Sequence, residues 1–229
     1  MRKLNKRMKE AVKLVVPSKK YSLEDAIAII KKAPHPKFDE SVDLSFKLHT
    51  DTKQGTQVVR GTVALPHGTG KKVTVAVFCK GEAESKARAA GADFAGGSEL
   101  VEKVSGGWCE FDVAIATPEM MKEMSRLGKV LGPRGLMPNP KAGTVTEDVA
   151  KAIKEVKAGR VEFRMDKQGN VHVPVGKVSF QEKALKENAQ SLIDVVAAAK
   201  PHGLKGKFIT GLAISSTMGP GVKLEYKAE

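Results

Sequence analysis

The sequence predicts a two-domain protein in which an α/β block interrupts an α+β domain. Strand-like segments near both ends of the chain alternate apolar and polar residues, which is typical of antiparallel sheets with one wet face. Segments in the middle are apolar on both faces, which is typical of parallel strands covered by helices on two sides. Each flank has too few strands to close a core by itself. We therefore expect residues 1–67 and 160–229 to form one discontinuous domain around an inserted domain of residues 68–159.

The N-terminal flank contains two helix signals followed by strands. Apolar residues at helical spacing mark residues 2–14 as the first helix. In "YSLEDAIAIIKKA", Ser22 is expected to cap the second helix with help from Asp25, and Pro34 ends it. The segments "SVDLSFKLHT" and "VVRGTVAL" then read as half-buried strands.

The middle block alternates strands with helices. The C-terminal flank again shows the alternating apolar and polar pattern of the N-terminal flank. "KVTVAVF" and "FDVAIAT" predict buried strands, with helices near 82–90, 98–105, 118–126 and 146–157. In the C-terminal flank a long amphipathic helix is expected over 181–199. Half-buried strands are expected at "NVHVPVG", "KFITGLAISS" and "GVKLEY".

The charge of the chain indicates a polyanionic partner. Its net charge is +13, of which the flanks carry +7 and +4 and the middle block only +2. Such an excess most often serves nucleic-acid binding. Aromatic residues make up only 5% of the chain, which argues against a base-stacking platform for single strands. A flank domain that reads the phosphates and the shape of a folded RNA is favoured.

Enzyme motifs fail on inspection. "GTGKKVT" lacks the spacing of a phosphate-binding loop, because Leu65 stands where a glycine is needed and Lys72 where Ser or Thr is needed. The five histidines show no metal-ligand spacing, and there is no GxSxG nucleophile elbow. We expect no cofactor, no metal and no catalysis. The alternative is an α/β enzyme that acts on nucleotides through the middle block.

Targeting signals are also missing from the sequence. The start, "MRKLNKRMKEAVKLVV", is basic but lacks the apolar stretch and cleavage site of a signal peptide. No run is long and apolar enough to cross a membrane. The expectation is a cytoplasmic protein without a membrane partner, in which Cys79 and Cys109 are reduced thiols.

"KFDES" (37–41) is the first candidate for contact with RNA. Lys37 suits a phosphate, and Phe38 can pack against a sugar or a base. The alternative is a buried Phe38 beside a solvated run of charges. Arginines near the suspected junctions suit bidentate phosphate contacts, although surface ion pairs are the default for each.

"STMGP" (216–220) is the second candidate. Thr217 offers a hydroxyl, Met218 a flexible apolar contact, and Gly219 room for another backbone. Pro220 stiffens the turn. An ordinary tight hairpin explains the same residues equally well.

One stretch identifies a family. "LGKVLGPRGLMPNPKAGTV" closely resembles the signature of the bacterial ribosomal protein L-one family, the side-stalk protein of the large subunit. "KFDESVDL", "VRGTVALPHGTGK", "GADFAGG", "KAGRVEFR" and "STMGP" resemble other blocks of that family in the same order. Within this signature, Arg134 either contacts RNA or braces its Gly- and Pro-rich loop, and bracing is expected.

The resemblance implies a fold, a function and a set of RNA-binding residues. The inserted domain would be a Rossmann-like three-layer α/β domain, and the flank domain would bind rRNA at the mobile stalk. The protein would be a monomer within the ribosome, assist release of deacylated tRNA from the exit site, and repress translation by binding its own mRNA leader. The RNA-binding positions carried over are Lys37, Phe38, Ser41, Arg60, Gly61, Thr62, Phe163, Arg164, Thr217, Met218 and Gly219.

Overall fold

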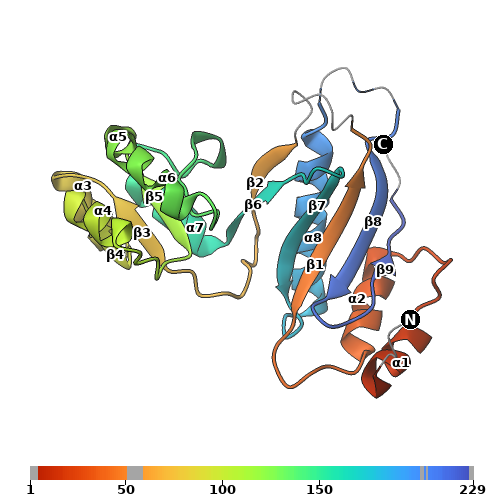
Figure 1. The fold of residues 1–229 in the computed structure, drawn as a ribbon. Coiled ribbons are helices and arrows are strands. Elements are labelled where there is room, and N and C mark those ends of the chain that lie inside the picture. Colours follow the sequence, from red (N-terminus) through yellow and green to blue (C-terminus); the bar gives the residue numbers. More distant parts are fainter. Residues whose placement is uncertain (1–4, 51–58, 202–203, 205, 227–229) are drawn as a thin grey trace. The chain divides into compact units, whose positions relative to one another are not determined.

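The structure, a computed structural model, describes residues 5–50, 59–201, 204 and 206–226 of the chain. Its contacts divide the chain into two compact units, Met1–Gly70 with Val161–Glu229 (unit 1) and Lys71–Arg160 (unit 2). In Figure 1, unit 1 comprises the segments coloured red to orange up to residue 70 and those coloured teal to blue from residue 161 onward, and unit 2 comprises the segments between them in the colour bar. The expected boundaries were 67/68 and 159/160. Each unit has an apolar core of its own.

Unit 1 is organised around a four-stranded antiparallel sheet in the order β7-β1-β8-β9. The strands are β1 (Ser41–Leu48), β7 (Asn170–Lys177), β8 (Ile209–Ser216) and β9 (Val222–Lys223). Leu44 of β1 lies opposite Val173 of β7 and Ile214 of β8. Every second side chain of β1, beginning with Val42, is buried, so the predicted alternation is confirmed. The strand expected at "GVKLEY" is much shorter than predicted.

Helices α2 (Leu23–Lys32) and α8 (Glu182–Ala198) cover one face of this sheet. Helix α1 (Lys6–Lys13) precedes them in the chain. Ser22 caps α2 as predicted, since its hydroxyl accepts a hydrogen bond from the Asp25 backbone N–H and donates one to the Asp25 carboxylate. Apolar residues of α2 and α8, such as Ile27 and Leu192, share one core with Phe46 of β1. The opposite sheet face carries the polar side chains of β1.

A second, two-stranded sheet joins β2 (Arg60–Ala64) to β6 (Arg160–Arg164). It lies near the C-terminal end of β1, because Met165 accepts a hydrogen bond from the Thr50 hydroxyl and its N–H bonds the Val59 carbonyl. Gly61 packs on the ring of Phe163. A Cβ added at Gly61 would lie 2.8 Å from Phe163 Cζ, so any larger residue would force the ring to move.

Unit 2 is a three-layer α/β structure, as predicted. Its parallel sheet has the order β4-β3-β5, from β3 (Val75–Phe78), β4 (Phe94–Gly96) and β5 (Val113–Ala116). Helix α4 (Ser98–Ser105) packs in one apolar cluster, and α3 (Glu82–Ala89) and α7 (Val149–Ala158) in another. Alternate residues of β3 belong to the two clusters, so the helices cover both faces of the sheet. Strand β4 was not predicted.

The helix predicted near 118–126 is broken into short pieces. They are a 3₁₀ turn at Pro118–Met120, α5 (Met121–Met124), a 3₁₀ turn at Ser125–Leu127 and α6 (Gly128–Leu131). Buried Met120, Met124, Leu127 and Leu131 still recur at spacings of three and four residues. The apolar period therefore predicts which side chains are buried, but not that the backbone tightens locally into 3₁₀ turns.

The Gly- and Pro-rich loop that follows α6 is held from within unit 2. The Leu136 N–H bonds the Leu131 carbonyl at 3.0 Å, and the Asn139 N–H bonds the Thr144 hydroxyl at 2.8 Å. Arg134 is exposed and makes no hydrogen bond or ion pair among the described residues. The expectation that Arg134 braces this loop is therefore wrong, because backbone bonds and Thr144 hold it instead.

Candidate RNA-binding site

The turn at residues 216–220 joins β8 to β9, as the hairpin interpretation predicts. The Gly219 N–H closes it on the Ser216 carbonyl at 3.1 Å. A Cβ added at Gly219 would lie 2.4 Å from Ser216 Oγ, so a larger residue here would require the Ser216 hydroxyl to move. Met218 at the tip is 52% exposed. The turn thus presents a large apolar side chain to solvent without support from an apolar neighbourhood.

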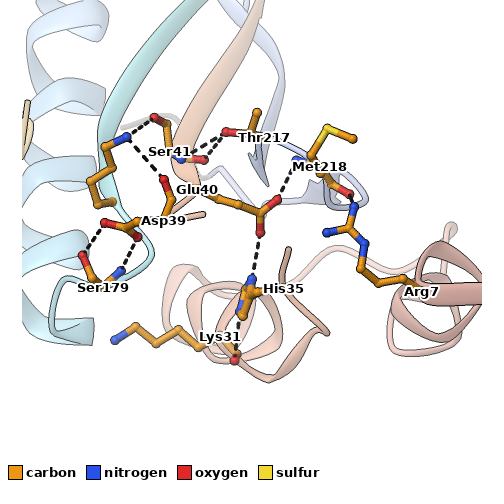
Figure 2. A network of polar contacts seen from close by, with 10 residues as sticks. Arg7, Lys31, His35, Asp39, Glu40, Ser41, Ser179, Thr217 and Met218 are labelled. Atoms are coloured by element: carbon orange, nitrogen blue, oxygen red, sulfur yellow. Dashed lines mark hydrogen bonds and ion pairs between the residues drawn. The ribbon is translucent and has the colours of Figure 1, made fainter. Parts of the chain in front are cut away.

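Residues 37–41 form a second loop, which its two acidic residues hold in place. The Ser179 N–H and hydroxyl donate to the Asp39 carboxylate at 3.2 and 2.8 Å. Glu40 is only 2% exposed. Its Oε2 lies 2.8 Å from His35 Nδ1, and its Oε1 accepts the Met218 N–H at 2.8 Å, as Figure 2 shows.

This arrangement is the opposite of the alternative interpretation of "KFDES", in which Phe38 is buried beside a solvated run of charges. Phe38 is 54% exposed, and Lys37 is exposed as well, whereas the supposedly solvated Glu40 is buried. Glu40 is therefore not part of a solvated run of charges, whereas Asp39 stays exposed and bonds Ser179. Lys37 and Phe38 remain on the surface.

The two loops are joined directly, although 176 residues separate them in the chain. The Ser41 N–H donates to Thr217 Oγ1 at 3.0 Å, and the Thr217 N–H and hydroxyl donate to the Ser41 carbonyl at 3.0 and 3.2 Å. Lys177 adds a bond to the Ser41 hydroxyl at 3.1 Å. We call residues 37–41 and 216–220 the loop pair. The Thr217 hydroxyl first positions these loops and keeps one lone pair for a ligand.

Three cationic side chains lie at the loop pair, beside its own two acids, Asp39 and Glu40. Lys37 and Lys177 lie on or beside it, and Arg7 of α1 reaches the Met218 carbonyl. The acid nearest to them on β1 is Asp43. Burial raises the pKa of the Asp43 carboxyl, and the positive charges of His172 and Lys177 oppose that rise. Positive charge and two exposed apolar side chains meet on one surface.

The remaining predicted residues lie elsewhere in the fold. Arg60, Gly61, Thr62, Phe163 and Arg164 belong to β2 and β6, near the C-terminal end of β1, whereas Ser41 begins β1. A strand of eight residues spans about 25 Å, so the structure does not bring this group together with the loop pair. Arg60 and Arg164 are exposed.

Phe163 requires a correction. Its ring is only 1% exposed and belongs to the core of unit 1. It therefore supports Gly61 from below and offers no surface of its own to RNA. The resemblance suggested a contact at this position, but burial makes Phe163 a packing residue.

Sequence reasoning missed the residues that hold the loop pair: Arg7, His35, Asp39, Glu40 and Lys177. Their bonds join residues far apart in the chain. The residues next to Glu40 in the sequence, Asp39 and Ser41, are polar, so they gave no sign that Glu40 would be buried. The one local signal was the position of "DES" immediately before a strongly alternating strand, where the chain must turn into the sheet.

In the described part of the chain, we find no side chains grouped for chemistry other than binding. No cluster of three or more His, Cys, Asp or Glu residues suited to a metal occurs there. Among the same residues, no helix is long and apolar enough to span a bilayer. The fold and the loop pair define a basic, two-unit protein whose exposed loops are held in place by bonds from other elements.

Comparison with known proteins gives the family. The pattern of the "Ribosomal protein L1p/L10e family" matches residues 29–220, and this chain belongs to that family. "Large ribosomal subunit protein uL1" of Kosmotoga olearia is 53% identical over 227 residues, covering 99% of this chain and 98% of the relative. The protein of the same name from Protochlamydia amoebophila is 52% identical over 223 residues, covering 97% and 94%. Members are structural and non-enzymatic, so the nucleotide-enzyme alternative is wrong.

Proposed function

We propose that this chain is a structural constituent of the large ribosomal subunit and that unit 1 binds rRNA through the loop pair. Its relatives are named as large-subunit proteins. The flank segments that make up most of unit 1 also hold +11 of the +13 net charge. Basic side chains there neutralise phosphates and release counterions, so affinity falls as salt rises.

The observation that carries the proposal is the rigid display of Phe38 and Met218. Each is more than half exposed, and each sits on a loop fixed by side chains of other elements. Non-helical RNA is recognised by apolar and aromatic contacts with unstacked bases and sugars. A surface that is already ordered loses little conformational entropy on binding. The loop pair therefore suits close fit against an irregular RNA feature.

The finer parts of the proposal concern the place and the consequences of binding. The rRNA site is the mobile stalk near the tRNA exit site, where the protein assists release of deacylated tRNA. The same loop pair binds a similar structure in the leader of the protein's own mRNA and represses its translation. Family membership supports these parts, and glycines at the junctions, such as Gly70 with φ +71°, suit a chain that turns between units.

Met218→Asp tests the loop pair. The substitution sets a carboxylate against RNA phosphates, and we expect affinity for a transcript of the rRNA stalk to fall about 100-fold or more, as at an interface hot spot. Val16→Asp is the matched control, because Val16 is 51% exposed in unit 1 and makes the same change of charge. Equal affinities of the two variants would contradict the proposal. Circular dichroism checks that both remain folded.

Two further measurements separate the finer parts. Co-sedimentation with large subunits at moderate salt tests ribosomal assembly, and Met218→Asp should abolish it while Val16→Asp retains it. Binding to the protein's own mRNA leader tests repression. If Met218→Asp weakens rRNA and leader binding by the same factor, one surface serves both. A leader that the wild-type chain does not bind removes the repressor role.

A further inference from the structure

Helix α1 brings an arginine against the turn of the loop pair. Asn5 caps this helix, with its side-chain oxygen accepting the Met8 N–H at 3.0 Å. The helix carries three lysines and Arg7 against a single acid, Glu10. Arg7 Nη2 donates to the Met218 carbonyl at 3.3 Å (Figure 2). The N-terminal helix is therefore part of the surroundings of the loop pair, although no motif in it indicated this.

The guanidinium of Arg7 is only partly satisfied. Its Nη1 is buried and has no hydrogen-bond partner among the described residues, and Arg7 forms no ion pair with a described carboxylate. A buried cationic donor without a partner is costly. Natural proteins pair nearly all such groups, and an exception beside a ligand surface points to the ligand as the missing acceptor.

The two polar groups of Met218 are held by opposite charges. The Glu40 carboxylate accepts the Met218 N–H, and Arg7 donates to the Met218 carbonyl. Glu40 also lies within hydrogen-bond distance of His35, so both of its carboxylate oxygens have partners within the protein. Arg7 Nη1 has none in the described part of the chain, and Arg7 forms no ion pair there, so its positive charge stays available at the turn.

We propose that Arg7 is a further RNA-binding residue, whose Nη2 holds the Met218 carbonyl while Nη1 donates to a phosphate oxygen of the bound RNA. This inference rests on the proposed function of the loop pair. A guanidinium presents its donors in a planar fork, which lets one side chain bond two acceptors in fixed geometry. Because Nη1 is buried in the free protein, this contact requires a change of the Arg7 side-chain torsions that exposes Nη1 when RNA docks on Met218.

The test compares Arg7→Gln with Lys13→Gln in the full-length chain. Both remove one positive charge from α1, but Lys13 is exposed and lies at the other end of the helix. The probe is a transcript of the rRNA stalk, titrated at several salt concentrations. We expect Arg7→Gln to weaken binding roughly tenfold or more, because a charge-assisted bond is lost. The slope of log K against log salt should also fall by about 0.7–0.9. Lys13→Gln should stay within about twofold.

Arg7→Lys sharpens the result, since lysine keeps the charge but cannot bond both acceptors in a fixed fork. We expect it to bind more weakly than wild type and to keep the wild-type salt slope. If Arg7→Gln weakens binding without changing the slope, Arg7 only positions the turn and the phosphate contact is wrong. If Arg7→Gln behaves as Lys13→Gln, Arg7 has no specific role.

Failure of this inference is distinguishable from failure of the proposed function. A wild-type chain that does not bind the transcript contradicts the proposed function itself. Wild-type binding that Met218→Asp abolishes and Arg7→Gln leaves intact removes Arg7 alone from the site. Thermal unfolding followed by circular dichroism verifies that the Arg7 variants keep the wild-type fold.

Discussion

Two stiff, Gly- and Pro-containing segments of this chain look alike in sequence and differ in how they are held. The loop over residues 131–140 is fixed by bonds within its own unit, and its charged residue, Arg134, is exposed and unpaired among the described residues. The turn over residues 216–220 is fixed from outside by Glu40, Ser41 and Arg7. The first segment carries the family's signature, and the second presents the exposed side chain of Met218, which belongs to the proposed RNA-binding surface.

The difference teaches where preorganisation comes from. In the loop over 131–140, Leu131 and Pro138 are buried, so apolar residues of this segment pack inside unit 2. In the turn over 216–220, polar bonds from three other elements replace that core contact, and Met218 stays exposed. Rigidity that is supplied by neighbours leaves the tip of a turn available to a ligand.

Glu40→Leu removes the shortest of these outside bonds. The Met218 N–H and the His35 ring lose their acceptor, and an unpaired buried polar group costs about 1–3 kcal/mol. We expect unit 1 to lose about 2–4 kcal/mol of unfolding free energy in urea, followed by far-UV circular dichroism. RNA affinity should fall as well, because the turn is released.

Glu162→Leu is the matched control for this prediction. Glu162 is an exposed acid of β6 whose side chain makes no bond among the described residues, and the change should cost less than about 0.5 kcal/mol. The fluorescence of Trp108, the sole tryptophan of the chain and a residue of unit 2, should report an unchanged transition in both variants. Equal stability of Glu40→Leu and wild type would remove Glu40 as the clamp.

Local patterns explain how much of this could be predicted from the sequence. The alternation of β1, the cap at Ser22 and the doubly apolar β3 are written in neighbouring residues, and the structure confirms them. Strand β4 is only three residues long and ends in glycine, so neither period nor propensity marks it. It forms because β3 offers an edge to pair with.

The bonds that hold the loop pair could not be predicted from the sequence for a different reason. Glu40 and Met218 are 178 residues apart, and their bond depends on the register of β1 against β8. No local pattern distinguishes a carboxylate that will be buried by such pairing from a solvated one. The exposure of Phe38 follows from the same pairing, which explains why both interpretations of "KFDES" were open.

Gly61→Ala tests the other group of predicted RNA-binding residues. The added methyl would press on the buried Phe163 ring, at 2.8 Å in the present geometry. Overpacking of this kind costs about 1–3 kcal/mol, which urea unfolding of unit 1 measures. Gly128→Ala is the opposite control, since Gly128 is helical and its Cβ would meet nothing. That change should stabilise unit 2 by about 0.5–1 kcal/mol.

The acid stability of unit 2 provides a smaller test, because the partly exposed carboxylate of Asp112 accepts hydrogen bonds from Lys71 and Thr74. A hydrogen bond from Lys71 and another from the Thr74 backbone hold the pKa of Asp112 below its ordinary value. A depressed pKa in the folded state adds stability that is complete above the unfolded pKa, near 3.9, and is lost as pH falls through the folded pKa. In Asp112→Asn, the unfolding midpoint of unit 2, followed by Trp108 fluorescence, should therefore decrease less steeply as the pH falls. An unchanged decrease would show that Asp112 does not cause it.

Arg134→Gln is expected to have the smallest effect and decides the opening comparison. An exposed arginine without a described partner should change the stability of unit 2 by less than about 0.5 kcal/mol, as followed by Trp108 fluorescence. Affinity for the rRNA transcript should stay within about twofold, since only the long-range field changes. A loss of tenfold or more would make the loop over 131–140 a second RNA contact. The two stiff segments would then differ in their support but share their task.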